Sequence, residues 1–191
     1  MKWVPHLSHG FIVAKVGKRT LTREGQTMSL TLADKAAVLA EKANHPAIAA
    51  LLAWKPDALA DARWDRDEMT LTIPREELIG AARAVRAAGY NFLEDVTAVD
   101  WLPAVPRFQV SYHIVSHTLK ERIRLRVLVD EASPAVETIT SVWPSANYYE
   151  REVFDLFGIR FDEHPNLRRI MMPEEWSGHP LRKDYPVEGY R

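Results

Sequence analysis

The sequence predicts an α+β fold, in which a small antiparallel or mixed sheet of about five strands has helices packed on one face and is followed by an extended C-terminal strap. Several segments between residues 59 and 129 alternate apolar and polar residues with the period of a strand, and short connections join them. Segments with helical spacing or capping signals lie before, between and after these strands. Prolines at positions 165, 173, 180 and 186 oppose regular structure in the last part.

The N-terminal part divides at about residue 30. Residues 1–30 contain three glycines and no sustained periodicity, so we expect a flexible extension. A capping-box pattern precedes the alanine-rich residues 32–43, which are predicted to be helical. A second helix is expected at residues 47–54, where Pro56 stops it.

Five segments are predicted to form the sheet. They cover residues 59–64, 68–73, 92–101, 108–116 and 123–129. The first two should pair as a hairpin around a charged turn at residues 65–67. The last two show the clearest alternation, because every second residue is apolar.

Three more helices are predicted. One begins with Pro74 at its first position and closes at Gly89, with apolar residues at helical spacing between them. A short helix is expected at residues 138–143 and a last one at residues 147–157, with Gly158 as its C-cap. The domain organisation predicted from these elements comprises the N-terminal extension, an α+β core domain at residues 31–158 and an extended docking segment at residues 159–191.

The composition limits the functional classes. A net charge of -1 gives the whole molecule no electrostatic reason to bind nucleic acid or an anionic membrane. The absence of cysteine excludes disulfides, cysteine-ligated iron–sulfur clusters and cysteine nucleophiles, and agrees with a reducing cytoplasm. Since no apolar run approaches the roughly 18 residues that span a bilayer, we expect any membrane association to be indirect.

Residues 150–186 combine ionic, aromatic and proline residues more densely than a core or a solvated face requires, which is typical of a protein interface. On the last helix, Arg151 and Asp155 are spaced for an i,i+4 pair. Carboxylates held partly out of water need partners, and arginines downstream provide them. The sequence leaves open whether these pairs close within the chain or across to a partner. The predicted interface residues are Glu150, Arg151, Glu152, Asp155, His164, Arg168, Arg169, Trp176, His179, Arg182, Lys183, Asp184 and Tyr185.

The same stretch does not support a catalytic or metal site. His164 and His179 lack the spacing of a zinc motif, and Glu150 and Glu152 diverge on a helix, so they do not form a hydrolytic carboxylate pair. A stand-alone hydrolase that uses either histidine with Glu150 is retained as an alternative. A nucleic-acid site is disfavoured because acidic residues interrupt the basic cluster at residues 168–183.

These residues also carry a resemblance to a known family. The motifs ERE, DLFG, HPNLRR and GHPLRKDYP, with TIPREEL and GYNFLEDVTAVDW upstream, stand in an order and spacing similar to the C subunit of the NADH-quinone oxidoreductases, which is the 30 kDa subunit of respiratory complex I. The resemblance begins near Pro46.

The resemblance implies a non-catalytic, cofactor-free subunit of the peripheral arm, on the cytoplasmic face of the bacterial cell membrane. It would pack on the large D subunit and support electron transfer from NADH to quinone in a proton-translocating enzyme. FMN, iron–sulfur clusters and quinone sites are expected in other subunits, and the motif residues would serve assembly and interfaces. The alternative that the resemblance leaves open is the equivalent subunit of a membrane-bound energy-converting hydrogenase or a related dehydrogenase.

Overall fold

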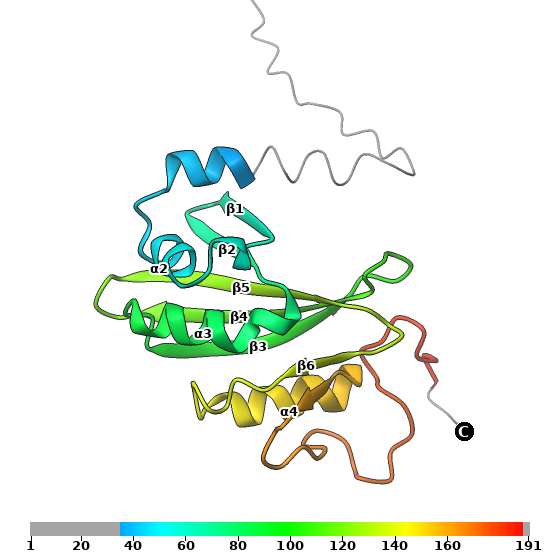
Figure 1. Cartoon of the computed structure of the whole chain (residues 1–191). Coiled ribbons are helices and arrows are strands. Elements are labelled where there is room, and N and C mark those ends of the chain that lie inside the picture. Colours follow the sequence, from blue (N-terminus) through cyan, green and yellow to red (C-terminus); the bar gives the residue numbers. More distant parts are fainter. Residues whose placement is uncertain (1–34, 189–191) are drawn as a thin grey trace, which may run out of the picture.

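The computed structural model describes residues 35–188, in which a mixed sheet carries helices on one face and a long irregular segment follows (Figure 1). The expected extension at residues 1–30 lies outside the described residues, as does the beginning of the helix predicted at residues 32–43. Residues 35–41 of that helix are helical. Among residues 35–188, no helix has both the length and the apolar character that a membrane crossing requires.

The sheet has five strands in the order β1-β2-β5-β4-β3. The strands are β1 (Asp61–Asp65), β2 (Glu68–Thr72), β3 (Phe92–Asp100), β4 (Phe108–Ser116) and β5 (Glu121–Val129). β2 and β5 are parallel and the other neighbours are antiparallel, which confirms the predicted mixed sheet. The hairpin turn consists of Arg66 and Asp67, both with positive φ (51° and 61°), as two-residue hairpin turns of the primed type require.

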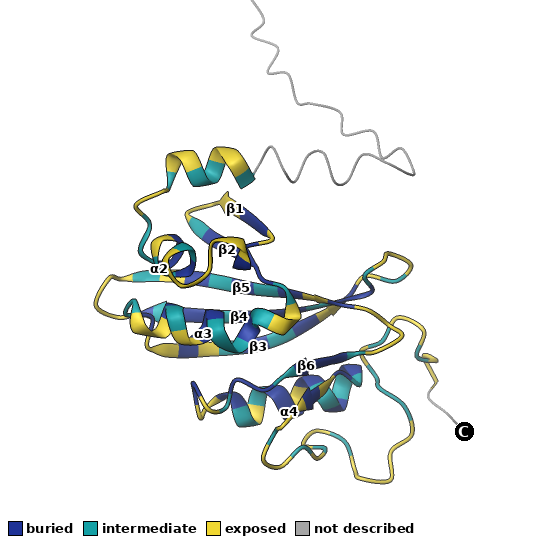
Figure 2. Ribbon diagram, in the orientation of Figure 1, coloured by how far each residue is buried: buried dark blue, intermediate teal, exposed yellow. Residues whose placement is uncertain are grey.

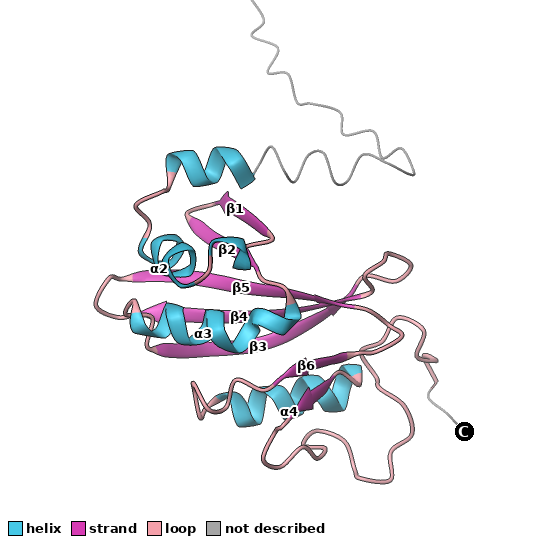
Figure 3. Ribbon diagram, in the orientation of Figure 1, coloured by secondary structure: helices cyan, strands magenta, loops and turns pink. Residues whose placement is uncertain are grey.

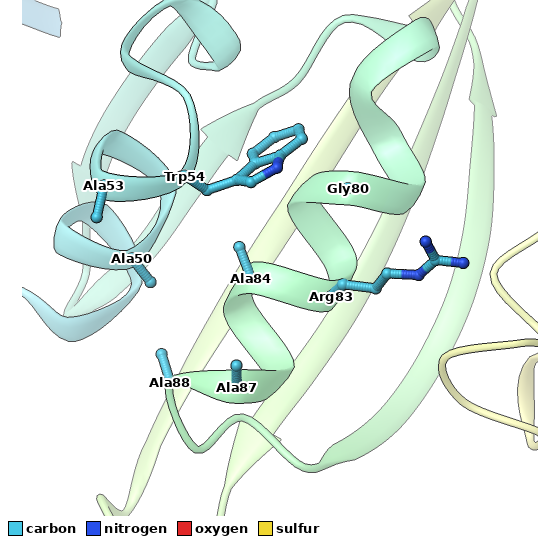
Figure 4. A pocket seen from close by; sticks show the side chains of 8 residues that line it. All are labelled: Ala50, Ala53, Trp54, Gly80, Arg83, Ala84, Ala87 and Ala88. Atoms are coloured by element: carbon cyan, nitrogen blue, oxygen red, sulfur yellow. The ribbon is translucent and has the colours of Figure 1, made fainter.

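Helices α2 (Pro46–Trp54) and α3 (Leu78–Ala87) lie side by side on one face of the sheet (Figures 3 and 4). Pro74 precedes a 3-10 turn at Arg75–Glu77 instead of opening the α-helix itself. The ring of Trp54 lies across α3 at Gly80, where a Cβ atom would come within 2.1 Å of the ring. A hollow of about 680 Å³ between the two helices is lined mostly by alanines (Figure 4).

The hydrophobic core lies between the helices and the sheet (Figure 2). Tyr112 and Phe108 of β4 are among its largest inaccessible side chains. On β2 the alternation predicted for the hairpin is present in Met69 and Leu71, but Thr70 on the opposite face is also buried. The reason is that long side chains from β5 cover the threonines on that face.

A smaller unit follows the sheet and packs against β3. It consists of β6 (Ala135–Glu137), α4 (Ala146–Phe157) and β7 (Arg160–Asp162), and β6 and β7 are parallel. The helix predicted at residues 138–143 is wrong: residues 135–137 form a strand, and a single turn follows in which the N–H groups of Val142 and Trp143 donate to the carbonyl O of Ile139. The N–H of Thr138 donates to the carbonyl O of Asp162, which extends the β6–β7 ladder to the position where the helix was predicted to begin.

The C-terminal strap, residues 163–188, has turns and bends but no helix or strand. It leaves β7 and loops around the end of α4 toward the β3–β4 connection (Figure 1). Most of its residues are exposed or half-buried (Figure 2).

Candidate protein-interaction site at α4 and the C-terminal strap

Helix α4 is rich in charge but mostly inaccessible. Val153 and Phe157 join the core, while the side chains of Glu150 and Asp155 have no exposed surface. The helix ends at Gly158, whose φ of 70° lies in the left-handed region that favours glycine, as predicted. Buried carboxylates require hydrogen-bond donors, and most of the donors to Asp155 come from the strap.

Asp155 anchors the strap to α4. Its Oδ2 atom accepts hydrogen bonds from three successive backbone N–H groups, those of Ile170 (2.9 Å), Met171 (2.7 Å) and Met172 (2.8 Å). Its Oδ1 atom binds Nη1 of Arg169 at 2.5 Å. Burial would raise the pKa of Asp155, but these four donors together outweigh it and lower the pKa from its usual value. A charged carboxylate thus fixes the path of the strap.

Two arginines link the helix and the strap further. Arg151 of α4 donates through Nε and Nη2 to the carbonyl oxygens of Arg168 (3.1 Å) and Arg169 (3.2 Å). Nη2 of Arg169 in turn donates to the carbonyl oxygen of Trp176 at 2.9 Å. The i,i+4 pair predicted between Arg151 and Asp155 is therefore replaced by separate bonds from each residue to the strap.

The strap also satisfies carbonyl groups at the end of α4, which have no partner within the helix. Its donors are a histidine ring, a backbone N–H and a guanidinium. The acceptor and donor pairs are Asp155 O with His179 Nδ1 (2.9 Å), Leu156 O with Leu181 N (3.0 Å) and Phe157 O with Arg182 Nε (2.5 Å). The positive charge of Arg182 also suits the negative end of the helix dipole.

A second anchor, the Arg107 clasp, holds the far end of the strap. Arg107 has 2% of its side chain exposed and binds both carboxylate oxygens of Asp184, at 3.0 and 2.6 Å. The same guanidinium binds Asp100 at 3.0 and 2.8 Å and Glu131 at 2.5 Å. The backbone N–H of Lys183 donates to Asp100 at 2.9 Å. Hydrogen bonds from Arg107, together with that backbone donor, lower the pKa of Asp100 far below its usual value, so the cluster stays charged.

Glu150 faces inward, away from the strap. Its carboxylate accepts hydrogen bonds from the hydroxyl of Thr138 (2.5 Å) and the N–H of Ile139 (2.9 Å). Burial raises the pKa of Glu150 to about 7, although both donors act in the opposite direction. The inaccessible ring of His164 lies 3.9 Å away and donates through Nε2 to the carbonyl oxygen of Asn147 at 3.1 Å. Burial lowers the pKa of His164, so this histidine is a neutral structural residue.

Large apolar side chains line the outside of the strap. They are Ile170 (40% exposed), Met171 (62%), Trp176 (39%), Leu181 (51%) and the fully exposed Val187. A hollow of about 390 Å³ opens beside Trp176. Apolar side chains that point outward from a backbone fixed by hydrogen bonds are typical of protein interfaces.

The structure sorts the predicted interface residues into three groups. Inaccessible or buried side chains belong to Glu150, Arg151, Asp155 and His164. Half-buried residues are Arg169, His179, Arg182 and Tyr185, and exposed residues are Glu152, Arg168, Trp176, Lys183 and Asp184. The question left open by the sequence is answered for Asp155, whose ion pair with Arg169 closes within the chain. A role of these residues in partner binding stays a prediction.

Sequence reasoning missed the Arg107 clasp. Asp100 ends β3 and Arg107 precedes β4, so in the sequence both look like ordinary charged residues of a loop. Glu131 lies in a turn more than 20 residues further along the chain. Neither periodicity nor local spacing connects these residues to Asp184. The one available signal was the acidic residue inside the basic GHPLRKDYP motif, which needs a cationic partner somewhere.

Within residues 35–188, no group of three or more histidine, aspartate or glutamate side chains is arranged to hold a metal ion.

Comparison with known proteins gives consistent matches. A family model described as the 30 Kd subunit of the respiratory-chain NADH dehydrogenase matches residues 71–191. The C subunit of the NADH-quinone oxidoreductase of Roseiflexus sp. (strain RS-1) is 46% identical over 147 residues, which are 75% of this chain and 84% of that protein. The corresponding protein of Citrifermentans bemidjiense, with the same description, is 45% identical over 147 residues, which are 76% of this chain and 91% of that protein.

Two solved structures share the fold. A trypsin-resistant fragment of Nqo5 has a TM-score of 0.50 at 39% sequence identity, covering 52% of this chain and 83% of the fragment. A chain of the membrane-bound sulfane sulfur reductase, an archaeal respiratory membrane complex, has a TM-score of 0.64 at 22% identity, covering 76% of this chain and 86% of that chain. The second likeness concerns the fold alone.

Proposed function

The chain belongs to the family of the 30 kDa subunit of the respiratory-chain NADH dehydrogenase, the C subunit of NADH-quinone oxidoreductase, and we propose that it is a non-catalytic, cofactor-free subunit of that enzyme's peripheral arm. Its task would be to hold neighbouring subunits in place while they carry electrons from NADH to quinone. The family match begins in β2 and includes α4 and the strap, so it covers the candidate site.

The observation that carries this proposal is the construction of the strap. Asp155 accepts hydrogen bonds from its backbone, and Arg107 binds the side chain of Asp184 near its end. Met171, Leu181 and Val187 point outward with half or more of their surface exposed. A segment that is ordered before binding loses less conformational entropy when it docks. Exposed apolar anchors on such a segment can therefore contribute binding energy with little ordering cost.

We propose that the large D subunit of the enzyme is the partner that covers the strap. The apolar side chains would form the centre of the contact, and exposed charges such as Glu152, Arg168 and Lys183 would form its rim. The buried members of the predicted set, among them Glu150 and His164, would support the surface from inside.

We also propose that the protein lies on the cytoplasmic face of the bacterial membrane and is held there through other subunits. FMN, the iron–sulfur clusters and quinone would be bound by those subunits. The sequence supports this division for cysteine-ligated clusters, because it contains no cysteine to bind them.

The alternative is the equivalent subunit of a membrane-bound energy-converting hydrogenase or a related dehydrogenase. The fold shared with a chain of the sulfane sulfur reductase complex shows that this architecture occurs in another respiratory membrane complex. The relatives at 45–46% identity favour the NADH-quinone oxidoreductase.

The test is co-purification of the full chain with the large subunit from membranes. Replacing both Met171 and Leu181 with serine should reduce recovery of the large subunit about tenfold or more, because truncating a central interface side chain typically costs above 1 kcal/mol. The matched control is Leu119→Ser, since Leu119 is 39% exposed at the β4–β5 turn on another part of the molecule. A purified chain that oxidises NADH with quinone by itself would falsify the non-catalytic role.

A further inference from the structure

The face of the sheet opposite α2 and α3, called the open face below, carries a dense array of charged side chains. Every second residue of β5 points to it, namely Arg122, Arg124, Arg126 and the exposed Leu128. Small polar residues of the neighbouring strands lie between the arginines, including Thr72 and Ser111 on either side of Arg126. Nothing in the proposed role of the strap uses this surface.

The arginines of the open face are held in place by bonds within the sheet. Arg126 donates through Nε to the hydroxyl of Thr72 at 2.8 Å and through Nη2 to Asp61 at 3.0 Å. Arg124 donates through Nε to the ring of His113 at 2.9 Å and also binds Glu68. Such fixed guanidinium groups are ready to receive further acceptors without losing rotational freedom.

Positive charge is in excess on the half of the face built by β1, β2 and β5. Five arginines stand there against four carboxylates. The arginines are Arg63, Arg66, Arg122, Arg124 and Arg126, and the carboxylates are Asp61, Asp65, Asp67 and Glu68. Burial is the main cause that lowers the pKa of Arg126, and the nearby charge of Arg63 lowers it further, while Asp61 acts in the opposite direction. The excess positive charge would attract an added carboxylate and repel an added cation.

The open face is also hollowed where this excess lies. A depression of about 340 Å³ is lined by four arginines, two acids, a threonine and a glutamine from β1, its turn, β2, β4 and β5. Because all of these side chains are polar or charged, the depression suits a polar ligand rather than an apolar helix. The side chains of Arg124 and Arg126, 31% and 17% exposed, form part of its lining.

We propose that the open face is a docking surface for an acidic, extended segment of a partner protein, with carboxylates on alternate residues lying over Arg124 and Arg126. Residues two apart in a strand are about 6.6 Å apart, and this spacing is the same in β5 and in an extended partner segment. Bidentate pairing of carboxylates with guanidinium groups would set the register. This surface is separate from the strap and goes beyond the proposed function.

Two other occupants fit the charges less well. Residues 1–34 of the same chain contain five lysines and arginines but only two acids, so they would be repelled. A nucleic-acid backbone presents continuous negative charge, which the carboxylates of Asp61, Asp65 and Glu68 on the same face would oppose.

A peptide titration tests the proposal on the full chain. The probe is a labelled eight-residue peptide of alternating glutamate and threonine, and the matched peptide has glutamine for glutamate. We expect measurable binding of the glutamate peptide, and at least tenfold weaker binding after each of Arg124→Gln and Arg126→Gln, since each variant removes a guanidinium group that would pair with a carboxylate of the peptide. Arg86→Gln, in an exposed position on α3, should bind like the unchanged chain. Equal binding of the two peptides, or equal weakening by Arg86→Gln, would overturn the proposal.

Photo-crosslinking in assembled membranes tests the natural occupant. A photoreactive amino acid in place of Gln109, which lines the depression, should join a partner segment with at least two carboxylates on alternate residues. Crosslinks to residues 1–34, to nucleic acid or to a segment without such carboxylates would contradict the proposal. The same probe at Val187 on the strap reports assembly independently. A crosslink at Val187 without one at Gln109 would reject the open face and leave the proposed function standing.

Discussion

Replacing Asp155 with asparagine should release the strap while the sheet stays folded. The carboxylate accepts three backbone N–H groups on one oxygen and Arg169 on the other. An asparagine can offer only one carbonyl oxygen, so its amide N–H₂ must face either the backbone donors or the guanidinium. Breaking a buried ion pair by removing one partner costs about 3–5 kcal/mol, and we expect a loss in this range.

Hydrogen exchange measured by mass spectrometry on the full chain checks this expectation. Peptides from the strap should exchange about a hundredfold to a few thousandfold faster in Asp155→Asn, because 1.4 kcal/mol corresponds to a factor of ten in local opening, while peptides from β4 and β5 should change little. The matched control is Glu152→Gln on the same helix, where the side chain is exposed. Strap peptides that exchange as slowly in folded Asp155→Asn as in the unchanged chain would refute the anchoring role of this carboxylate.

Three further outcomes are expected. Asp184→Asn should loosen only the end of the strap, by about 1–3 kcal/mol, because Arg107 keeps its other acids. Faster hydrogen exchange of peptides from residues 179–188 measures this loosening, and unchanged exchange contradicts it. Glu150 has a folded-state pKa raised from 4.5 to about 7, so its stabilising effect is complete below pH 4.5 and is lost as the pH rises through 7. Urea unfolding of Glu150→Gln should therefore show a pH dependence between 5 and 8 that is weaker by up to about 3 kcal/mol, and an unaltered pH profile would exclude this linkage. Gly158→Ala should lower the urea midpoint by an amount corresponding to about 1–3 kcal/mol, because φ is 70° and the new Cβ would lie 2.5 Å from His179; an unchanged midpoint would show that the chain end adapts freely.

The sheet could be predicted from the sequence because its signals are local. The segments at residues 92–101, 108–116 and 123–129 alternate clearly, and each lies within a few residues of an observed strand. The left-handed cap at Gly158 was predictable for the same reason. What local patterns do not contain is the parallel pairing of β2 with β5, which joins segments more than 50 residues apart.

The wrong helix at residues 138–143 shows how distant contacts override local preference. The N–H of Thr138 bonds to Asp162, beyond α4, and continues the β6–β7 ladder, so the backbone is still extended where the helix was expected to begin. The candidate site follows the same rule. The motifs in residues 150–186 showed which residue types the site contains. The direction of a side chain such as that of Asp184 depends on a partner far away in the chain, here Arg107.

The bonds from the strap to α4 also set an order of events during synthesis. The strands of the sheet and α4 leave the ribosome before the residues that hold Asp155 and cover the last carbonyl groups of the helix. Until Arg169 and Arg182 have been added to the chain, Asp155 and the last carbonyl groups of α4 lack these hydrogen-bond donors. The backbone that holds the outward apolar side chains of the strap is then not yet fixed. The surface proposed for the large subunit therefore forms only after the strands of the sheet and α4 have been synthesised.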